Sequence, residues 1–184
     1  MSVALPELPR AARFAPRLIR AGGDLKSSLG GPTQRISRLG SRYAVDVALP
    51  TMDLACGQAW VAAQLQAEAI GATVRLALPQ RRDLPTGVTA TGASGSTLVD
   101  VTGAGGAAIV AGMLFSFESG GVSYLHMVTG VDGAELSVAP RLRAALAGAL
   151  EFEAPQVEGF LEETSWSVEL LRFVGQTFTI TEAR

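Results

Sequence analysis

Thr33–Pro79 reads TQRISRLGSRYAVDVALP TMDLACGQAWVAAQLQAEAIGA TVRLALP, the longest run of this chain with a legible pattern. Its first part alternates apolar and polar residues, which predicts a half-buried strand over Arg35–Leu49. The residues expected to face the core are Tyr43, Val45, Val47 and Leu49. The apolar parity changes across Gly40, so a bulge or a tight hairpin is predicted there. Pro50 ends the strand.

A helix follows at about residues 53–70. Thr51 or Asp53 is the expected N-cap, and Gly71 the expected glycine just past the C-terminus. The apolar stripe is expected at Leu54, Val61, Ala62, Leu65 and Ala69, with Trp60 beside it, and the exposed face at Gln58, Gln64, Gln66 and Glu68. A second strand is predicted at Thr73–Leu78. With so few other helical patterns, we expect the helix to pack on a mainly antiparallel sheet.

A linker is expected at Gln80–Ser96. After it, the sequence pattern is that of short strands separated by glycine turns. These strands are predicted at Thr97–Val101, Met113–Phe117, Val122–Thr129 and Ala134–Val138, with turns at Gly103–Gly106, Glu118–Gly121 and Asp132-Gly133. Such spacing is typical of a small antiparallel barrel. We therefore predict an inserted barrel-like subdomain over residues 96–145. A turn or two of helix is predicted after it, at Ala144–Leu150.

The two ends of the chain complete the prediction. Residues 1–32 are rich in proline and glycine, and are expected to form an extended leader arm that orders only on assembly, with one short strand at Arg17–Arg20. A closing strand is predicted over Trp166–Ile180, bent near Leu171 and Gly175 and paired with the first strand. The fold class is therefore mainly β. It is a β-sandwich of residues 33–95 and 146–184 with one packed α-helix, plus the inserted barrel.

Composition bears on the surface of the molecule. Apolar residues make up 48% and charged residues 17% of the 184 residues, and the mean hydropathy is +0.30. This balance fits either apolar surface buried between copies or a simple bias toward alanine and glycine. Arginines gather early in the chain and glutamates late, which would suit head-to-tail contact between copies or two solvated faces. A net charge of −2 argues against nucleic-acid recognition.

The sequence contains few residues of the types that usually carry out catalysis or bind metals. A single cysteine, Cys56, excludes a disulfide framework and is expected to be buried, and a single histidine, His126, is expected to be structural or to face an interface. Glu151 and Glu153 are a weak candidate pair of hydrolase carboxylates. Gly103–Gly106 lacks the lysine of a phosphate-binding loop. We therefore predict no enzymatic activity, cofactor or metal site, no membrane insertion and no signal peptide.

Several motifs, taken in their order along the chain, resemble those of a known protein family. They are QRISRLGSRY (Gln34–Tyr43), VALP (Val47–Pro50), Ala59-Trp60 on the helix, Val74-Arg75-Leu76, YLHMV (Tyr124–Val128), VAPRLR (Val138–Arg143) and the aromatic strand Trp166–Ile180. This order resembles the distal tail and baseplate-adaptor proteins of long-tailed, siphovirus-like bacteriophages and prophages. The resemblance covers most of the chain beyond residue 32.

The resemblance implies a structural virion protein that forms a ring, usually of six copies, at the tip of the phage tail after assembly in the bacterial cytoplasm. Its implied partners are further copies of itself, the tail tube protein, the hub or central fibre, and the tape-measure protein. The candidate subunit-interface residues are Arg35, Arg38, Arg42 and Trp60. The alternative function is a host-surface polysaccharide-binding module, with Phe115, Phe117 and Tyr124 of the insert stacking on sugar rings.

Overall fold

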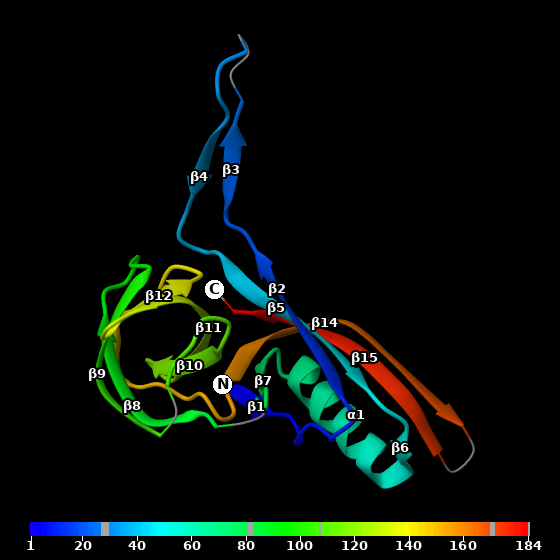
Figure 1. Cartoon of the computed structure of the whole chain (residues 1–184). Helices are drawn as coiled ribbons and strands as arrows, with labels where there is room; N and C mark the ends of the chain where they lie inside the picture. Colours follow the sequence, from blue (N-terminus) through cyan, green and yellow to red (C-terminus); the bar gives the residue numbers. More distant parts are fainter. Residues whose placement is uncertain (27–29, 81–82, 107, 170–171, 184) are drawn as a thin grey trace.

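The computed structural model describes residues 1–26, 30–80, 83–106, 108–169 and 172–183. The protein is mainly β with one packed α-helix, which confirms the predicted fold class. Figure 1 shows three parts: a twisted main sheet that carries the helix, a nearly closed barrel beside it, and a two-stranded arm that projects away from both.

The main sheet has seven strands in the order β1-β7-β14-β15-β5-β2, with β6 paired to β15. These strands are β1 (Ser2–Ala4), β2 (Arg13–Ile19), β5 (Arg42–Leu49), β6 (Met52–Asp53), β7 (Thr73–Ala77), β14 (Gln156–Glu169) and β15 (Arg172–Glu182). All pairs are antiparallel except β1 with β7. The closing strand pairs with the first predicted strand as expected, with Thr179 opposite Asp46.

The closing segment is a hairpin and not the single bent strand predicted over Trp166–Ile180. It is formed by β14 and β15, whose register shifts between Glu162 and Ser165 and again between Ser167 and Val168. The reversal between two strands and these shifts account for the changes of parity in the sequence. The bend predicted at Gly175 coincides with the second shift, whereas the one near Leu171 falls outside the described residues.

The first 32 residues differ most from expectation. Instead of a leader without structure of its own, they supply β1 and β2, which pair with β7 and β5 inside the main sheet. The strand expected at Arg17–Arg20 is the end of β2. Proline was a poor guide here because it is tolerated on edge strands: Pro16 lies in β2, at the edge of the sheet, opposite Val45.

The strand predicted over Arg35–Leu49 is two strands, β4 (Gln34–Ser37) and β5. Strand β4 pairs with β3 (Gly22–Leu25) to make the arm, while β5 returns into the main sheet. Gly40, at φ 118°, lies between them, so the parity change marks a junction, not the predicted bulge or tight hairpin. A hydrogen bond from Arg38 N to the Ala21 carbonyl, 2.9 Å long, holds the junction.

Helix α1 (Leu54–Ala69) begins and ends as predicted. The Asp53 side chain accepts a hydrogen bond of 2.8 Å from the backbone N–H of Cys56, an N-cap that satisfies one free donor of the first turn. Gly71, at φ 61°, follows the last turn and donates to the Glu68 carbonyl. Cys56 is exposed, against the prediction that it would be buried.

The buried face of α1 was predicted wrongly. The buried residues are Gly57, Trp60, Gln64 and Ala67, whereas Leu65 is 47% exposed. Gln64 is accommodated because it is hydrogen-bonded to the side chain of Gln176. Gly57 decides the orientation: a Cβ there would come 2.2 Å from the Phe173 ring, so the glycine lets helix and sheet approach closely.

The barrel is a six-stranded sheet in the order β10-β11-β12-β9-β8-β13. Its strands are β8 (Pro85–Gly92), β9 (Leu98–Gly106), β10 (Leu114–Ser119), β11 (Val122–Asp132), β12 (Glu135–Ala139) and β13 (Leu146–Ala149). Ser116 and Glu151 exchange two backbone hydrogen bonds, of 3.0 and 2.9 Å, which nearly close the ring between β13 and β10. Strands β10 to β12 lie where they were predicted, but β10 extends to Ser119, so the first turn is shorter than the predicted Glu118–Gly121.

The barrel is longer at both ends than the predicted span of residues 96–145. Strand β8 occupies the supposed linker Gln80–Ser96, and β13 occupies the supposed helix Ala144–Leu150. Gly103–Gly106 belongs to β9 and is not a turn. Strands β8 and β13 and the second half of β9 are rich in glycine, alanine and threonine, so these segments carry turn signals without the apolar alternation of an ordinary strand.

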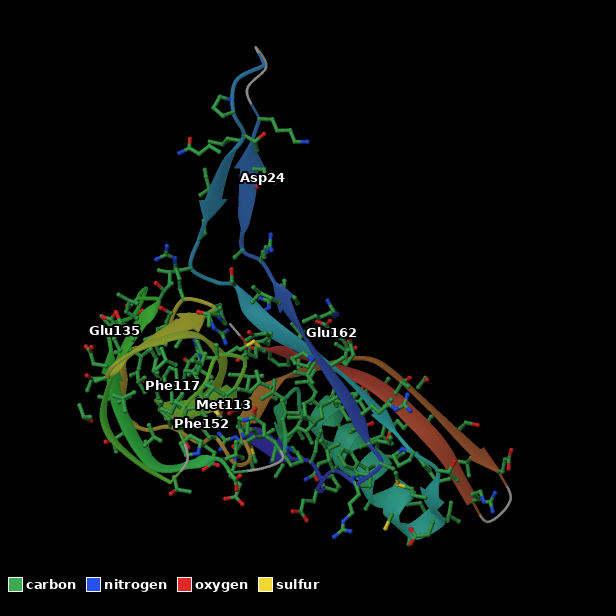
Figure 2. The ribbon with its side chains drawn as sticks, in the orientation of Figure 1. Asp24, Met113, Phe117, Glu135, Phe152 and Glu162 are labelled. Atoms are coloured by element: carbon green, nitrogen blue, oxygen red, sulfur yellow. The ribbon has the colours of Figure 1, made fainter. Side chains whose placement is uncertain are left out.

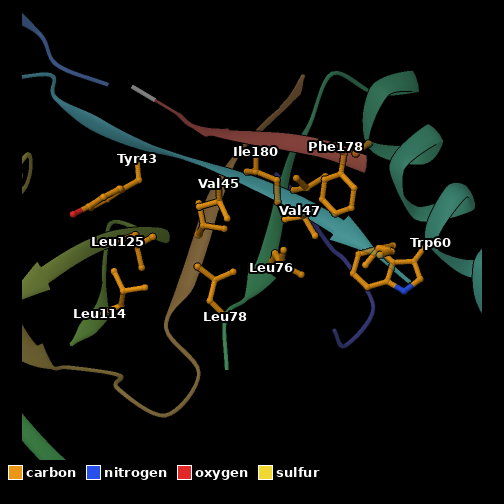
Figure 3. Close-up of a cluster of buried hydrophobic side chains, with 14 residues drawn as sticks. Tyr43, Val45, Val47, Trp60, Leu76, Leu78, Leu114, Leu125, Phe178 and Ile180 are labelled. Carbon is orange, nitrogen blue, oxygen red and sulfur yellow. The ribbon is translucent and has the colours of Figure 1, made fainter. Parts of the chain in front are cut away.

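Two hydrophobic cores meet at the barrel hairpin β10–β11. Trp60 of α1 covers one end of the inner face of the main sheet, while Leu114 and Leu125 of the barrel cover the other end (Figure 3). The opposite face of the same hairpin places Phe115 and Phe117 in the barrel core. Strands β10 and β11 therefore belong to both cores, and the barrel is fused to the main sheet.

Candidate assembly surface

The arm (β3 and β4) is the most unusual feature of the surface. Its two strands pair only with each other, and every residue of β3 is exposed. An isolated two-stranded hairpin is marginally stable in water because it buries almost no apolar surface. The arm projects away from both cores (Figure 1), so nothing in the described part of the chain supplies that surface.

The three predicted interface arginines follow this arm and its junction with the sheet. Arg35 lies in β4 opposite Asp24, and its side chain is outside the described residues. Arg38 is exposed at the base of the arm. Arg42 begins β5 and lines a hollow of about 270 Å³ with Phe160 and other residues. The arginines thus share one segment.

Trp60 lies elsewhere. Its side chain is 3% exposed, and its ring centroid is 5.9 Å from that of Phe178 in the main core. Of the two roles open to this residue, core anchor or subunit contact, the structure supports the first. Trp60 therefore leaves the set of candidate interface residues.

The outer face of the main sheet is a second open surface. Both α1 and the barrel cover the inner face, so in the described part of the chain the outer face has no covering layer (Figure 1). Strand register aligns its side chains in rows that cross β2, β5, β15 and β14. The rows are Arg13–Ala48–Thr177–Ser165, Ala15–Asp46–Thr179–Glu162 and Arg17–Ala44–Thr181–Phe160. Most of these side chains are small, so few of them project far from the sheet, and another protein surface could pack closely against this face.

Hydrogen bonds fix the polar side chains of this face. Asp46 accepts from Thr179 at 2.7 Å and from Arg17 at 3.3 Å, and Glu162 accepts from Thr181 at 2.9 Å. Side chains already held in one conformation lose little entropy when a partner covers them. The outer face is therefore preorganised for contact.

Two carboxylates fasten the barrel to the main sheet. Glu182 is fully buried and accepts backbone N–H groups from both sides, Tyr43 N at 2.7 Å and Leu125 N at 2.9 Å. Arg143 forms a 2.8 Å ion pair with it and lies over the Tyr124 ring. Burial raises the pKa of Glu182, opposed by Arg143 and the two N–H donors. The carboxylate thus replaces a missing strand partner for two strands at once.

Glu158 likewise links the main sheet to β11, at a residue two positions before the one that Glu182 binds. It accepts from Ser123 N at 3.1 Å, from Thr73 Oγ1 at 3.0 Å and from Arg75 at 2.7 Å. Burial alone would raise the pKa of Glu158, but these hydrogen bonds and the Arg75 charge outweigh it and hold the pKa below its usual value. Ser123 and Leu125 are two residues apart, so both carboxylates serve one edge of β11.

His126 lies inside the barrel, not at a surface. It is fully buried and stacked between Phe115, at 5.7 Å, and Phe117, at 5.4 Å between ring centroids. Neither ring nitrogen has a hydrogen bond of good geometry within the described residues, although the backbone at Tyr124 and Arg141 is near enough to favour the charged ring in part. Burial, with the nearby Arg143 charge, lowers the pKa of His126 to about 4. His126 therefore has a structural position in the barrel core, which is one of the two predicted roles.

The remaining chemical candidates have structural positions. Glu151 accepts backbone N–H groups of Glu153 and Ala154 at 2.9 and 3.0 Å, which shapes a turn. Within the described ranges, no group of three or more Asp, Glu, His or Cys side chains could hold a metal ion. Nor does any helix among those residues have the length and apolarity to cross a membrane.

Comparison with known proteins adds no assignment. No protein-family model matches the chain, and no curated protein sequence matches it at a significant level.

Sequence reasoning missed the buried carboxylates. One of them left a signal: Glu182 has the same parity as Phe178 and Ile180, which face the core, so the pattern placed a carboxylate inward at the end of β15. Glu158 left none, because its burial depends on β11 arriving from the distant insert. Neither strand pairing nor domain docking of that kind can be read from local periodicity.

Proposed function

We propose that the chain is a structural virion protein that forms a homo-oligomeric ring at the distal end of a phage tail. In that role it joins the tail tube to the hub or central fibre, with the tape-measure protein as a further neighbour. The observation that carries the proposal is the arm, a hairpin whose two strands pair only with each other within the described ranges and whose strand β3 is exposed along its whole length. Such an element gains stability when another copy covers it.

The outer face of the main sheet supports the same role. A low surface of alanine, serine and threonine side chains, fixed by hydrogen bonds, suits packing against a neighbouring subunit or tube ring.

The mass of the native protein tests the proposal. Native mass spectrometry and light scattering over a wide concentration range should give a discrete closed oligomer, and imaging of particles should place it at the tail tip. A matched variant, in which a Gly-Ser turn replaces residues 22–37, should keep the fold but lose most of the oligomer. A chain that stays monomeric at every concentration and is missing from particles would refute the proposal.

No observation favours the polysaccharide-binding alternative. Phe115 and Phe117 are 0% and 3% exposed. Figure 2 shows Phe117 among the barrel strands. Tyr124 is covered by Arg143, 5.1 Å from its ring centroid. The three aromatic residues that suggested sugar stacking therefore present no open ring face.

A further inference from the structure

Charge is divided unevenly along the chain. Residues 1–42 contain eight basic and two acidic residues, whereas the rest contains seven basic and fifteen acidic residues. The structure turns this division into two surfaces. The basic segment forms edge strand β2 and the arm, with Arg13, Arg20, Lys26 and Arg38 exposed. We call this surface the basic edge.

The acidic counterpart lies on the outside of the barrel. Register places Glu135 of β12 opposite Asp100 of β9 on one side and opposite Asp132 of β11 on the other. All three side chains are exposed, while the neighbouring Val99 and Leu136 point into the barrel core. We call these three residues the acidic row. Like charges directly opposite each other on paired strands are destabilising, so the row has a cost to the isolated chain.

The two surfaces do not meet within one molecule. The base of the arm borders a hollow of about 540 Å³ that Thr97 and Val138 of the barrel also line. The acidic row does not line this hollow, and Figure 2 shows Asp24 on the arm well separated from Glu135 at the outer edge of the barrel. The strand edge itself is also a poor site for adding another strand, because Pro16 removes one backbone donor from β2. Contact at the basic edge therefore depends on side-chain charge.

We propose that the basic edge of one copy docks on the acidic row of a second copy, an inference that rests on the ring-forming function proposed above. Opposite charges would then relieve the repulsion within each surface and supply the arm with its missing partner. The contact is head-to-tail because it joins two different surfaces, and repeated contacts of this kind close into a ring when the rotation allows it.

A second copy fits this edge better than a nucleic acid does. The net charge of the chain is −2 and the barrel exterior is acidic, so the molecule as a whole repels a phosphate backbone. Another copy brings an acidic surface at a fixed stoichiometry of one per basic edge.

Two charge-reversed proteins and a control test the contact. The arm variant carries Arg20→Glu, Lys26→Glu and Arg38→Glu, and the barrel variant carries Asp100→Lys, Asp132→Lys and Glu135→Lys. The control carries Glu7→Lys, Glu68→Lys and Asp83→Lys, which reverses the same number of exposed acids away from both surfaces. Oligomer mass is measured for each protein, and circular dichroism establishes that each is folded.

Each reversed variant alone should assemble with an affinity weaker by about 100-fold or more, while the control assembles like the wild type. An equimolar mixture of the two variants should regain the oligomer, with alternating subunits, because each arm then meets a barrel of opposite sign. Raising salt from about 0.1 to about 1 M should weaken wild-type assembly, since the Debye length falls from about 10 to about 3 Å.

Distinct results would overturn distinct statements. Unchanged oligomers from both variants, or a mixture that stays dissociated, would refute this contact and leave ring formation standing. A wild-type chain that is monomeric throughout would remove the proposed function as well. Binding of a DNA duplex by the wild type and not by the arm variant would assign the basic edge to nucleic acid and refute the contact with a second copy.

Discussion

His126 makes the stability of the barrel depend on pH. Its pKa is about 4 in the folded protein and about 6.5 in an unfolded chain, so the unfolded state binds more protons between these values. Stability is complete above pH 6.5 and falls as the pH drops toward 4, by about 3 kcal/mol in total. Urea unfolding at a series of pH values measures this loss.

The matched protein is His126→Phe, which keeps an aromatic ring between Phe115 and Phe117 and removes the titrating group. Subtracting its pH profile cancels the contribution of Glu182, whose raised pKa acts in the opposite direction. If wild type and variant lose stability in parallel from pH 6.5 to 4, the histidine is not responsible.

At the residue scale, the sequence predicted which side chains are buried better than it predicted their hydrogen-bond partners. Tyr43, Val45 and Val47 were predicted to face the core and are at most 5% exposed, because alternation along a half-buried strand is a local property. The parity of Glu182 pointed inward in the same way. Its partners could not be predicted, since Tyr43 N and Leu125 N come from strands that meet only after the barrel has docked.

The packing of α1 depends on one glycine. A Cβ at position 57 would lie 2.2 Å from Cγ of Phe173, so Gly57→Ala must push the helix away from β15 or displace the ring. Although alanine is the better helix former, we expect a loss of about 2 kcal/mol, as is usual for an overpacked core. Thermal unfolding measures the loss.

A second substitution separates the contact from the backbone effect. Phe173→Leu should partly rescue Gly57→Ala, so that the double variant is less destabilised than the sum of the two single ones. Strict additivity would mean that the glycine is needed for a reason other than this ring.

At the element scale the prediction succeeded for the helix boundaries and failed for its face. Asp53 and Gly71 are local signals that act on their own backbone. The buried face instead follows from Gly57 and from the hydrogen bond between Gln64 and Gln176, both of which require the facing strand. Because alanine lies on most sides of α1, the sequence pattern alone hardly distinguishes the buried face of the helix from the exposed one.

For the whole molecule, assembly should order the arm. Its amides have protection only from the single ladder between β3 and β4, whereas β5 and β15 lie within a larger sheet. Hydrogen exchange in dilute monomer should therefore be at least about 100-fold faster in the arm than in β5, and should slow when the oligomer forms. Arm amides that are strongly protected in the monomer would contradict this expectation.

At this scale, the sequence predicted the main subdomains but not how distant segments pair with one another. The middle of the barrel insert was predicted from its glycine turns, and β15 from its aromatic residues, although the closing segment as a whole is a hairpin. The N-terminal strands were missed because Pro16 argues against a strand, although an edge position tolerates it. Strands β8 and β13 were also missed, because their glycine, alanine and threonine residues lack the apolar alternation of an ordinary strand.

The hairpin β10–β11 constrains how such a protein can evolve. Because one side of it completes the main core and the other fills the barrel, excising the insert would leave Tyr43 and Val45 beside an open hole, where Leu114 and Leu125 now pack. The barrel is thus not an exchangeable cassette. A chain without the barrel would need other apolar side chains in place of Leu114 and Leu125 to cover this end of the main sheet.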